Sequence, residues 1–187
     1  MSTAWPDLEG PADDVARRLL GCVLERTFDD GVVKVMIVET EAYHQSDAAS
    51  HSYKGKTPRT DVMFGPAGFL YVYFTYGMHY CCNIVTGEEG EGAAVLIRAV
   101  EPLQGEDILR REGRTRFDVT NGPAKLCQAL AIDKRLNGHN LLKSPLKLHL
   151  MKPLAESDII TTPRIGIKKA IDMPWRFYIR GNNYVSK

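Results

Sequence analysis

The chain has 187 residues, a formal net charge of +1, and 44% hydrophobic and 25% charged residues. This balance is typical of one soluble globular domain and excludes wholesale disorder. The sequence has no apolar run of about 18 residues, which excludes a membrane-spanning helix. The first ten residues lack the basic and apolar regions of a secretory signal. We therefore expect one intracellular domain over residues 1–187.

The first predicted element is a helix over residues 11–20, with acidic side chains in its first turn and a glycine after its last. Residues 22–28 and 32–40 are rich in apolar and β-branched side chains and predict two strands joined by a tight Asp-Asp-Gly turn. Residues 44–68 are rich in Ser, Gly, Pro and Lys, which is typical of a loop.

The remaining elements are mostly strands separated by turns. Strands are predicted over residues 69–76, 78–86, 93–100, 146–151 and 176–180, and short helices over residues 106–112 and 124–132. Strands outnumber helices, and no repeat or interdomain linker occurs. We therefore expect an α+β fold in a single domain.

Two carboxylates lie where the apolar strand 32–40 ends. Residues two apart on a strand share a face, so Glu39 and Glu41 are expected to point the same way. A carboxylate at the edge of a core is a candidate general base. The alternative is that the strand simply reaches the surface, where both glutamates are solvated.

Side chains of residues 69–76 are expected to alternate between two faces of a strand. One face is apolar and is expected to lie in the core; it carries Leu70, Val72 and Phe74. The other face carries Tyr71 and Tyr73, which could stack a planar ring. Tyr76 precedes Gly77 at the expected hairpin tip, where an aromatic ring could insert between base pairs. The alternative is an ordinary aromatic cluster.

Four further features are polar and unusual for their context. Asn83 and Arg98 lie inside predicted strands, where a buried amide needs a hydrogen bond or polar ligand and a buried guanidinium needs a carboxylate or phosphate. His51 lies in a Ser-rich loop, where solvation is the simpler interpretation. Residues 54–60 (KGKTPRT) carry three cations and could contact phosphates, or could be an ordinary basic loop.

The net charge conceals an asymmetry along the chain. Residues 1–100 hold 8 Lys and Arg against 14 Asp and Glu, whereas residues 101–187 hold 16 against 9. This distribution could form a basic face for phosphates, or a mixed solvated surface.

Motifs for cofactors and metals are absent from the sequence. The chain has no CxxC pair, no nucleotide-binding glycine motif and no metalloprotease or hydrolase signature. We therefore expect no cofactor, no disulfide and no metal; a zinc site formed by cysteines with His51 or His79 is the remaining alternative.

Seven segments, in order, resemble the alkyladenine (3-methyladenine) DNA glycosylase family. They are IVETEAY (37–43), SHS (50–52), KTPRT (56–60), LYVYFTYGMHYCCNI (70–84), AAVLIRAVEPL (93–103), NGPAKLCQALAI (121–132) and RFYIRG (176–181). The resemblance covers nearly the whole chain. It implies an antiparallel sheet with flanking helices and a protruding β-hairpin that inserts into DNA, rather than a helix-hairpin-helix architecture.

The resemblance also implies catalytic roles for three positions. Glu41 matches the general base that deprotonates a water at C1′ of a flipped nucleotide. Arg98 and a backbone carbonyl near Ile165 match the groups that hold this water.

Base and DNA contacts are implied in the same way. Tyr43, Tyr73 and His51 match the side chains around the flipped base, and His51 matches the group that hydrogen-bonds its edge. Asn83 matches the residue that crowds the exocyclic amino group of guanine. The hairpin wedge and the phosphate contacts match Tyr76, Thr57 and Arg59.

The implied function is a monofunctional base-excision repair enzyme for damaged purines. The expected substrates are 3-methyladenine, 7-methylguanine and hypoxanthine, with ethenoadenine as a further candidate. The expected partner is double-stranded DNA, bound by a monomer in the bacterial cytoplasm at the nucleoid, or in the nucleus of a eukaryote. Two alternatives remain open: a non-catalytic duplex-DNA-binding module, and a hydrolase of free nucleosides.

Overall fold

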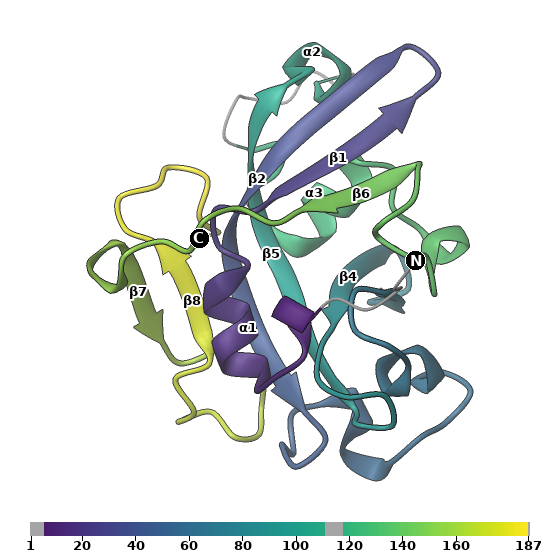
Figure 1. Ribbon diagram of the computed structural model, residues 1–187, viewed down its shortest axis with the longest axis vertical. Helices are drawn as coiled ribbons and strands as arrows, with labels where there is room; N and C mark the ends of the chain where they lie inside the picture. The colour runs from purple at the N-terminus through teal and green to yellow at the C-terminus, as the bar shows by residue number, and fades with distance from the viewer. Residues whose placement is uncertain (1–5, 111–117, 187) are drawn as a thin grey trace.

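The computed structural model describes residues 6–110 and 118–186, which share one curled antiparallel sheet with short helices against it (Figure 1). Its eight strands are β1 (Val23–Phe28), β2 (Gly31–His44), β3 (Leu70–Thr75), β4 (His79–Val85), β5 (Ala93–Gln104), β6 (Leu146–His149), β7 (Ile159–Thr162) and β8 (Arg176–Ile179). The helices are α1 (Ala12–Arg18), α2 (Glu106–Leu109) and α3 (Pro123–Ala129), with 3₁₀ turns η1 (Pro6–Leu8), η2 (His51–Lys54), η3 (Asp61–Phe64), η4 (Lys134–Leu136) and η5 (Glu156–Asp158). The expected α+β class with an antiparallel sheet is confirmed.

Strand β2 is the axis of the sheet and changes partner along its length. The strand order is β3-β4-β5-β2-β1-β6, and β8 pairs with β2 and β7 off this path. Residues 31–36 of β2 pair with β1, whereas Glu39, Thr40 and Glu41 pair with β8. The register between β2 and β5 shifts between Ile37 and Thr40. Such an irregularity bends a strand and changes the direction of its side chains. Here it lies at Glu39, two residues before Glu41.

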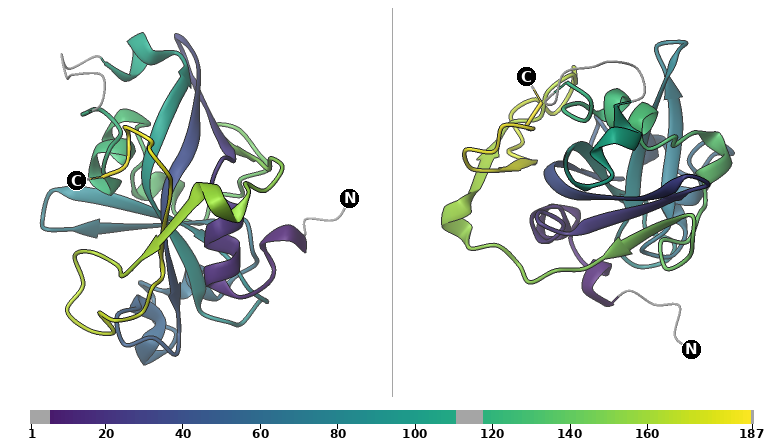
Figure 2. Two further views of the ribbon diagram at one scale, coloured as in Figure 1. Left: turned by 90° about the vertical axis from the view of Figure 1, so that its left-hand side faces the viewer. Right: turned by 90° about the horizontal axis from the view of Figure 1, so that it is seen from above.

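Helices α1 and α3 cover opposite faces of the sheet (Figures 1 and 2). Helix α1 packs on β2, β5 and β8, and α3 packs on β4 and β5. The largest core cluster contains fully buried side chains from both helical layers and from the central strands, among them Leu19, Ile37, Ile97 and Leu126. Each such burial contributes roughly 1.5–3 kcal/mol.

The observed elements differ from the predicted ones mainly at their ends. Strand β2 extends to His44 and β5 to Gln104, whereas α3 ends at Ala129. The predicted loop 44–68 contains the two turns η2 and η3, and β7 was not predicted. Of the predicted helix 106–112, α2 accounts for Glu106–Leu109, and positions 111–112 lie outside the described residues.

The β3–β4 hairpin projects from the body of the molecule (Figure 2). Its turn has positive φ angles at Tyr76 (51°) and Gly77 (68°), and two successive residues in this region match the twist of an antiparallel ribbon. Tyr76 is 84% exposed. The prediction that Phe74 lies in the core was wrong, because β3 has left the body by that point. The Phe74 ring is 50% exposed and packs on Tyr80 of β4.

No helix in the described parts of the chain is long and apolar enough to cross a membrane.

The central strand β5 offers a direct test of the core. Replacing the fully buried Ile97 with Ala should lower the free energy of unfolding by roughly 2–5 kcal/mol, because apolar contacts are lost and a cavity remains. Leu103→Ala on the same strand, at a 55% exposed position, should change it by less than about 0.5 kcal/mol. Urea unfolding measures both, and equal losses would show that residue 97 is not in the core.

Candidate active site

One cavity of about 630 Å³ lies beside the part of β2 where β8 replaces β1 as the paired strand. It is bounded by the ends of β2 and β5, by the β3–β4 hairpin, by η2 and by the segment 165–169 between β7 and β8. Of the ten predicted site residues, all except Thr57 line it: Glu41, Tyr43, His51, Arg59, Tyr73, Tyr76, Asn83, Arg98 and Ile165. Residues from five separate segments therefore meet in one place.

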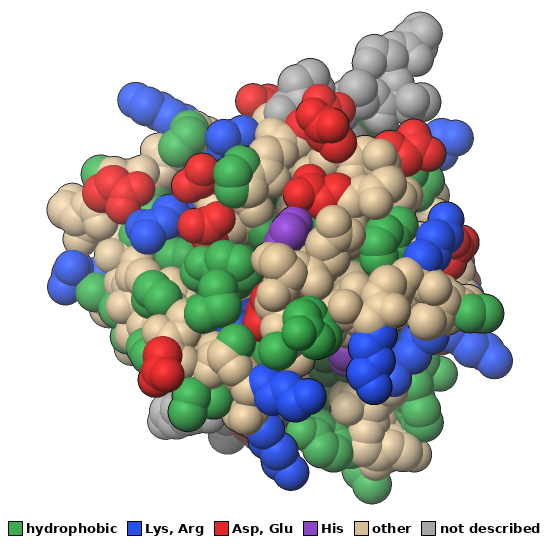
Figure 3. All heavy atoms as spheres, turned by 90° about the horizontal axis from the view of Figure 1, so that it is seen from below, with side chains coloured by type: hydrophobic (Ala, Val, Ile, Leu, Met, Phe, Trp, Pro, Cys, Tyr) green, Lys and Arg blue, Asp and Glu red, His purple; other side chains and the backbone are tan. Residues whose placement is uncertain are grey.

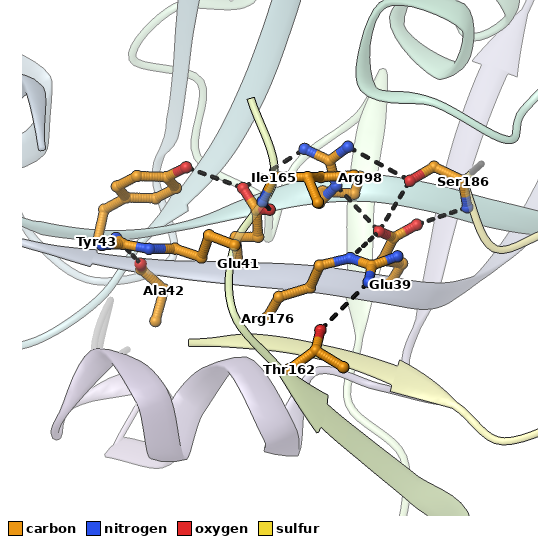
Figure 4. Close-up of polar contacts among 10 residues, drawn as sticks. Glu39, Glu41, Ala42, Tyr43, Arg98, Thr162, Ile165, Arg176 and Ser186 are labelled. Carbon is orange, nitrogen blue, oxygen red and sulfur yellow. Dashed lines mark hydrogen bonds and ion pairs between the residues drawn. The ribbon is translucent and has the colours of Figure 1, made fainter. Parts of the chain in front are cut away.

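Glu41 is a buried carboxylate at this cavity, with a donor on each oxygen (Figure 4). The Ile165 N–H donates to Oε1 at 2.9 Å, and the Tyr43 hydroxyl donates to Oε2 at 2.8 Å. The Arg98 guanidinium Nη1 lies 3.4 Å from the same Oε2. These contacts hold the carboxylate in one orientation, and the alternative of a solvated glutamate is excluded because its side chain has no exposed area.

Glu39 lies on the same side of β2 as Glu41, as predicted, but does not line the cavity (Figure 4). Its Oε1 accepts from Arg98 Nε at 3.0 Å, Arg176 Nε at 2.7 Å and Ser186 Oγ at 2.8 Å. Its Oε2 accepts from the Ser186 N–H at 2.7 Å. Its two oxygens accept four hydrogen bonds from structural donors, so Glu39 is a counter-ion for Arg98 and Arg176, whereas Glu41 lines the cavity.

Aromatic side chains from β2 and β3 form the walls. Tyr71 and Tyr73 are roughly parallel, with ring centroids 5.7 Å apart, and the His51 ring stands edge-on to Tyr73 at 4.5 Å. His51 Nδ1 lies 3.1 Å from the Tyr71 hydroxyl. Burial raises the pKa of Tyr43, Tyr71 and Tyr73, so all three hydroxyls stay protonated at neutral pH and Tyr43 can only donate to Glu41.

The electrostatics of His51 favour its neutral form. Desolvation of the ring against the cavity wall lowers the pKa of His51, and the nearby positive charge of Arg59 lowers it further. A neutral imidazole carries one donor and one acceptor nitrogen, so it can read either kind of group on a ring edge.

The cavity floor adds polar groups from β4. Asn83 is 4% exposed and its Nδ2 donates to the Tyr71 carbonyl at 3.2 Å, which satisfies the expectation that a buried amide here is hydrogen-bonded. Cys81 lines the cavity as well, and burial raises the pKa of its thiol to about 11. All four cysteines are free, and no group of three or more potential metal ligands occurs among the described residues.

Cations surround the mouth of the cavity. Arg59, Lys168 and Lys169 line it and are exposed. Figure 3 shows Lys and Arg side chains spread over one face, including its lower part, and most Asp and Glu side chains in its upper part. Thr57 stays apart: it is exposed and its hydroxyl lies 3.0 Å from that of Thr60 within the same turn.

Four residues at or beside the cavity were not among the predicted site residues. Tyr71 was placed with Tyr73 on a strand face that could stack a planar ring, but it was not named among the site residues, although it lines the cavity. Lys168 and Lys169 lie three and four residues after Ile165, and this closeness of two cations to a predicted site residue was overlooked. Nothing local in the sequence indicated Arg164, whose charged partner Asp47 and whose contacts with Ala42 and Tyr43 lie more than 100 residues earlier in the chain.

The chain is similar to known proteins over nearly its whole length. The sequence model of methylpurine-DNA glycosylase (MPG) matches residues 7–183. The chain is 54% identical over 177 residues to a protein of Carboxydothermus hydrogenoformans, 49% over 179 residues to one of Francisella tularensis, and 47% over 178 residues to one of Methanoculleus marisnigri. These alignments cover 92–93% of this chain and of each relative, and all three relatives are named, provisionally, as 3-methyladenine DNA glycosylases.

The coupling between Arg59 and His51 can be measured by titration. Arg59→Gln removes a positive charge that disfavours the imidazolium, so the pKa of His51 should rise. It should stay below the ordinary histidine value, because desolvation is the larger cause and is unchanged. NMR titration of the imidazole signals checks this, with His51→Asn used to assign the signal of His51. A His51 pKa that falls or does not move would contradict the proposed coupling.

Proposed function

The chain belongs to the methylpurine-DNA glycosylase family, and we propose that it is a monofunctional enzyme that flips damaged purines out of duplex DNA and hydrolyses their N-glycosidic bonds. We propose 3-methyladenine, 7-methylguanine and hypoxanthine as its substrates, with ethenoadenine as a further candidate. The observation that carries the proposal is the buried Glu41 carboxylate, held on both oxygens at the edge of an aromatic cavity.

The chemistry requires a base and a source of negative charge at one point. Glu41 deprotonates a water that attacks C1′, and its carboxylate stabilises the positive charge that develops on the sugar. The Ile165 N–H and the Tyr43 hydroxyl orient the carboxylate, and Arg98 lies close enough to share in holding the water. A backbone carbonyl near Ile165 completes the water site in this proposal.

The side chains that line the cavity explain how the site would select among purine bases. Tyr43, Tyr73 and His51 enclose a planar ring, and the tyrosine faces attract purines made cationic by alkylation. Such bases are good leaving groups, so a positioned base and water suffice for them. Neutral hypoxanthine also needs a proton on the departing base. Asn83 projects into the cavity and would crowd the exocyclic amino group of guanine.

In this proposal the β3–β4 hairpin and the exposed cations near the cavity contact the DNA. Tyr76, 84% exposed at the hairpin tip, would fill the gap left by the flipped nucleotide and offset part of the few kcal/mol that flipping costs. Arg59, with Thr57 beside it, would contact phosphates. A monomer suffices for this geometry, because the cavity and the hairpin belong to one chain, and the substrate DNA would be that of the bacterial cytoplasm or the eukaryotic nucleus.

The proposal of a monofunctional enzyme rests on the exposure of the two lysines that line the cavity. A lysine nucleophile is activated by removal from water, and Lys168 and Lys169, which line the cavity, are both exposed. Water activated by Glu41 is therefore the nucleophile that this site favours.

Replacement of the carboxylate tests the function directly. Glu41→Gln should slow release of 3-methyladenine or hypoxanthine from duplex DNA by roughly 10²–10⁴-fold, the usual contribution of a general base, while binding of the lesion duplex is retained. Abasic-site detection and gel-shift titration measure the two quantities. Glu156→Gln, at an exposed glutamate paired with Arg17, is the control and should behave as wild type.

The same assay separates the alternatives. A wild-type chain that binds duplex DNA but releases no base would be a non-catalytic binding module. Wild-type turnover by Glu41→Gln would remove Glu41 from the reaction.

The hairpin tip provides an independent test. Tyr76→Ala should reduce excision from duplex DNA by roughly 10-fold, equivalent to about 1.4 kcal/mol, and should reduce excision from single-stranded DNA less, because no gap has to be filled. Met151→Ala, also at an exposed apolar position, should have no effect. A hydrolase of free nucleosides would instead be unaffected by Tyr76→Ala on every substrate that it cleaves.

A further inference from the structure

Arg164 is a buried arginine that lies next to the candidate site without lining the cavity. It follows β7 and immediately precedes Ile165, whose N–H donates to Glu41. Its side chain has no exposed area. A guanidinium so placed needs charged and polar partners, since an unpaired buried charge is strongly destabilising.

The partners of Arg164 lie at the end of β2, just after it, and in the segment 170–175 before β8. Nη1 donates to the carbonyl of Ala42 at 2.9 Å and to the carboxylate of Asp47, which is equally buried. The carbon of the guanidinium lies 4.7 Å from the centroid of the Tyr43 ring and 5.5 Å from that of Trp175. Arg164 therefore binds the backbone carbonyl of Ala42, the residue between Glu41 and Tyr43. It also packs against the Tyr43 ring on the side away from the cavity.

Resting on the proposed function, we propose that Arg164 is a positioning residue, paired with Asp47, that holds the general base Glu41 and the stacking wall Tyr43 in one fixed relation. The backbone of Arg164 delivers the Ile165 N–H to Glu41 Oε1, and its side chain anchors Ala42 and Tyr43. One residue thus sets both the orientation of the carboxylate and the position of the ring against which the base stacks.

The chemistry of the pair explains why an arginine with an aspartate suits this place. A planar guanidinium can stack on Tyr43 and donate in its own plane at the same time, which an ammonium cannot do. The Asp47 carboxylate neutralises it, so no net positive charge lies behind Tyr43. The cavity face of that ring therefore stays attractive to a cationic purine.

The test uses Asp47→Asn and Arg164→Lys in the full chain. The amide of D47N is isosteric with the carboxylate and still accepts from Arg164, whereas R164K keeps the charge but loses the planar stack. The expected result is a single-turnover excision rate on a 3-methyladenine duplex that is roughly 10- to 100-fold slower in R164K, the scale expected when a reacting group is displaced by about 1 Å. D47N should be slowed less, in the same direction. Affinity for undamaged duplex DNA should stay within about 2-fold of wild type in both.

A matched control separates positioning from stability. Leu148→Ala lowers stability by emptying a buried site on β6, far along the sheet order from the cavity, and its folded fraction should excise at the wild-type rate. Thermal unfolding gives the folded fraction of each variant. If L148A slows excision as much as R164K does, or if folded R164K and D47N both excise at the wild-type rate, the inference is overturned. If R164K does not fold, D47N decides alone.

The wild-type chain separates this inference from the proposed function. Wild-type protein that releases no base overturns both. Release by wild type, together with unchanged rates in both variants, overturns only the role of Arg164.

Discussion

Two carboxylates two residues apart on one buried strand face are the constraint around which this molecule is organised. Like charges so close in the interior are tolerated only when cations and donors are supplied to both. Arg98 lies between them, 3.0 Å from Glu39 and 3.4 Å from Glu41, and Arg176 adds a second cation on Glu39. The topology supplies these partners: β5 runs along one edge of β2, and β8 replaces β1 along the other where the glutamates begin.

The two glutamates receive different hydrogen-bond donors, and only Glu41 of the two lines the cavity. Glu39 is saturated by Arg98, Arg176 and Ser186 and is closed to the cavity. Glu41 receives the Ile165 N–H and the Tyr43 hydroxyl and opens on the cavity. Glu39 is already a counter-ion for Arg98. Arg98 can therefore lie beside Glu41 without needing the Glu41 carboxylate as its only counter-ion. A preorganised charge of this kind is the arrangement that most favours catalysis in a water-poor site.

Sequence reasoning reached the parts of this arrangement that depend on local periodicity. Alternation and burial alone predict the shared face of Glu39 and Glu41, the tyrosine face of β3, and the need of Arg98 for a carboxylate or phosphate partner. Which glutamate faces the cavity could not be predicted, because the deciding donors come from Ile165, Arg176 and Ser186 far along the chain. The resemblance to a known family supplied that choice. Phe74 was misplaced because alternation cannot show where a hairpin leaves the body of the protein.

The bonds between Ser186 and Glu39 also bear on how the protein is made. Synthesis proceeds from the N-terminus, and β2 leaves the ribosome well before β8 and the residues that follow it. Until residue 186 has emerged, Glu39 lacks two of its four hydrogen bonds, and until residue 176 has emerged it lacks a third. Three of the four hydrogen bonds of Glu39 therefore form later than the contacts between β1 and β2, which lie close together in the chain.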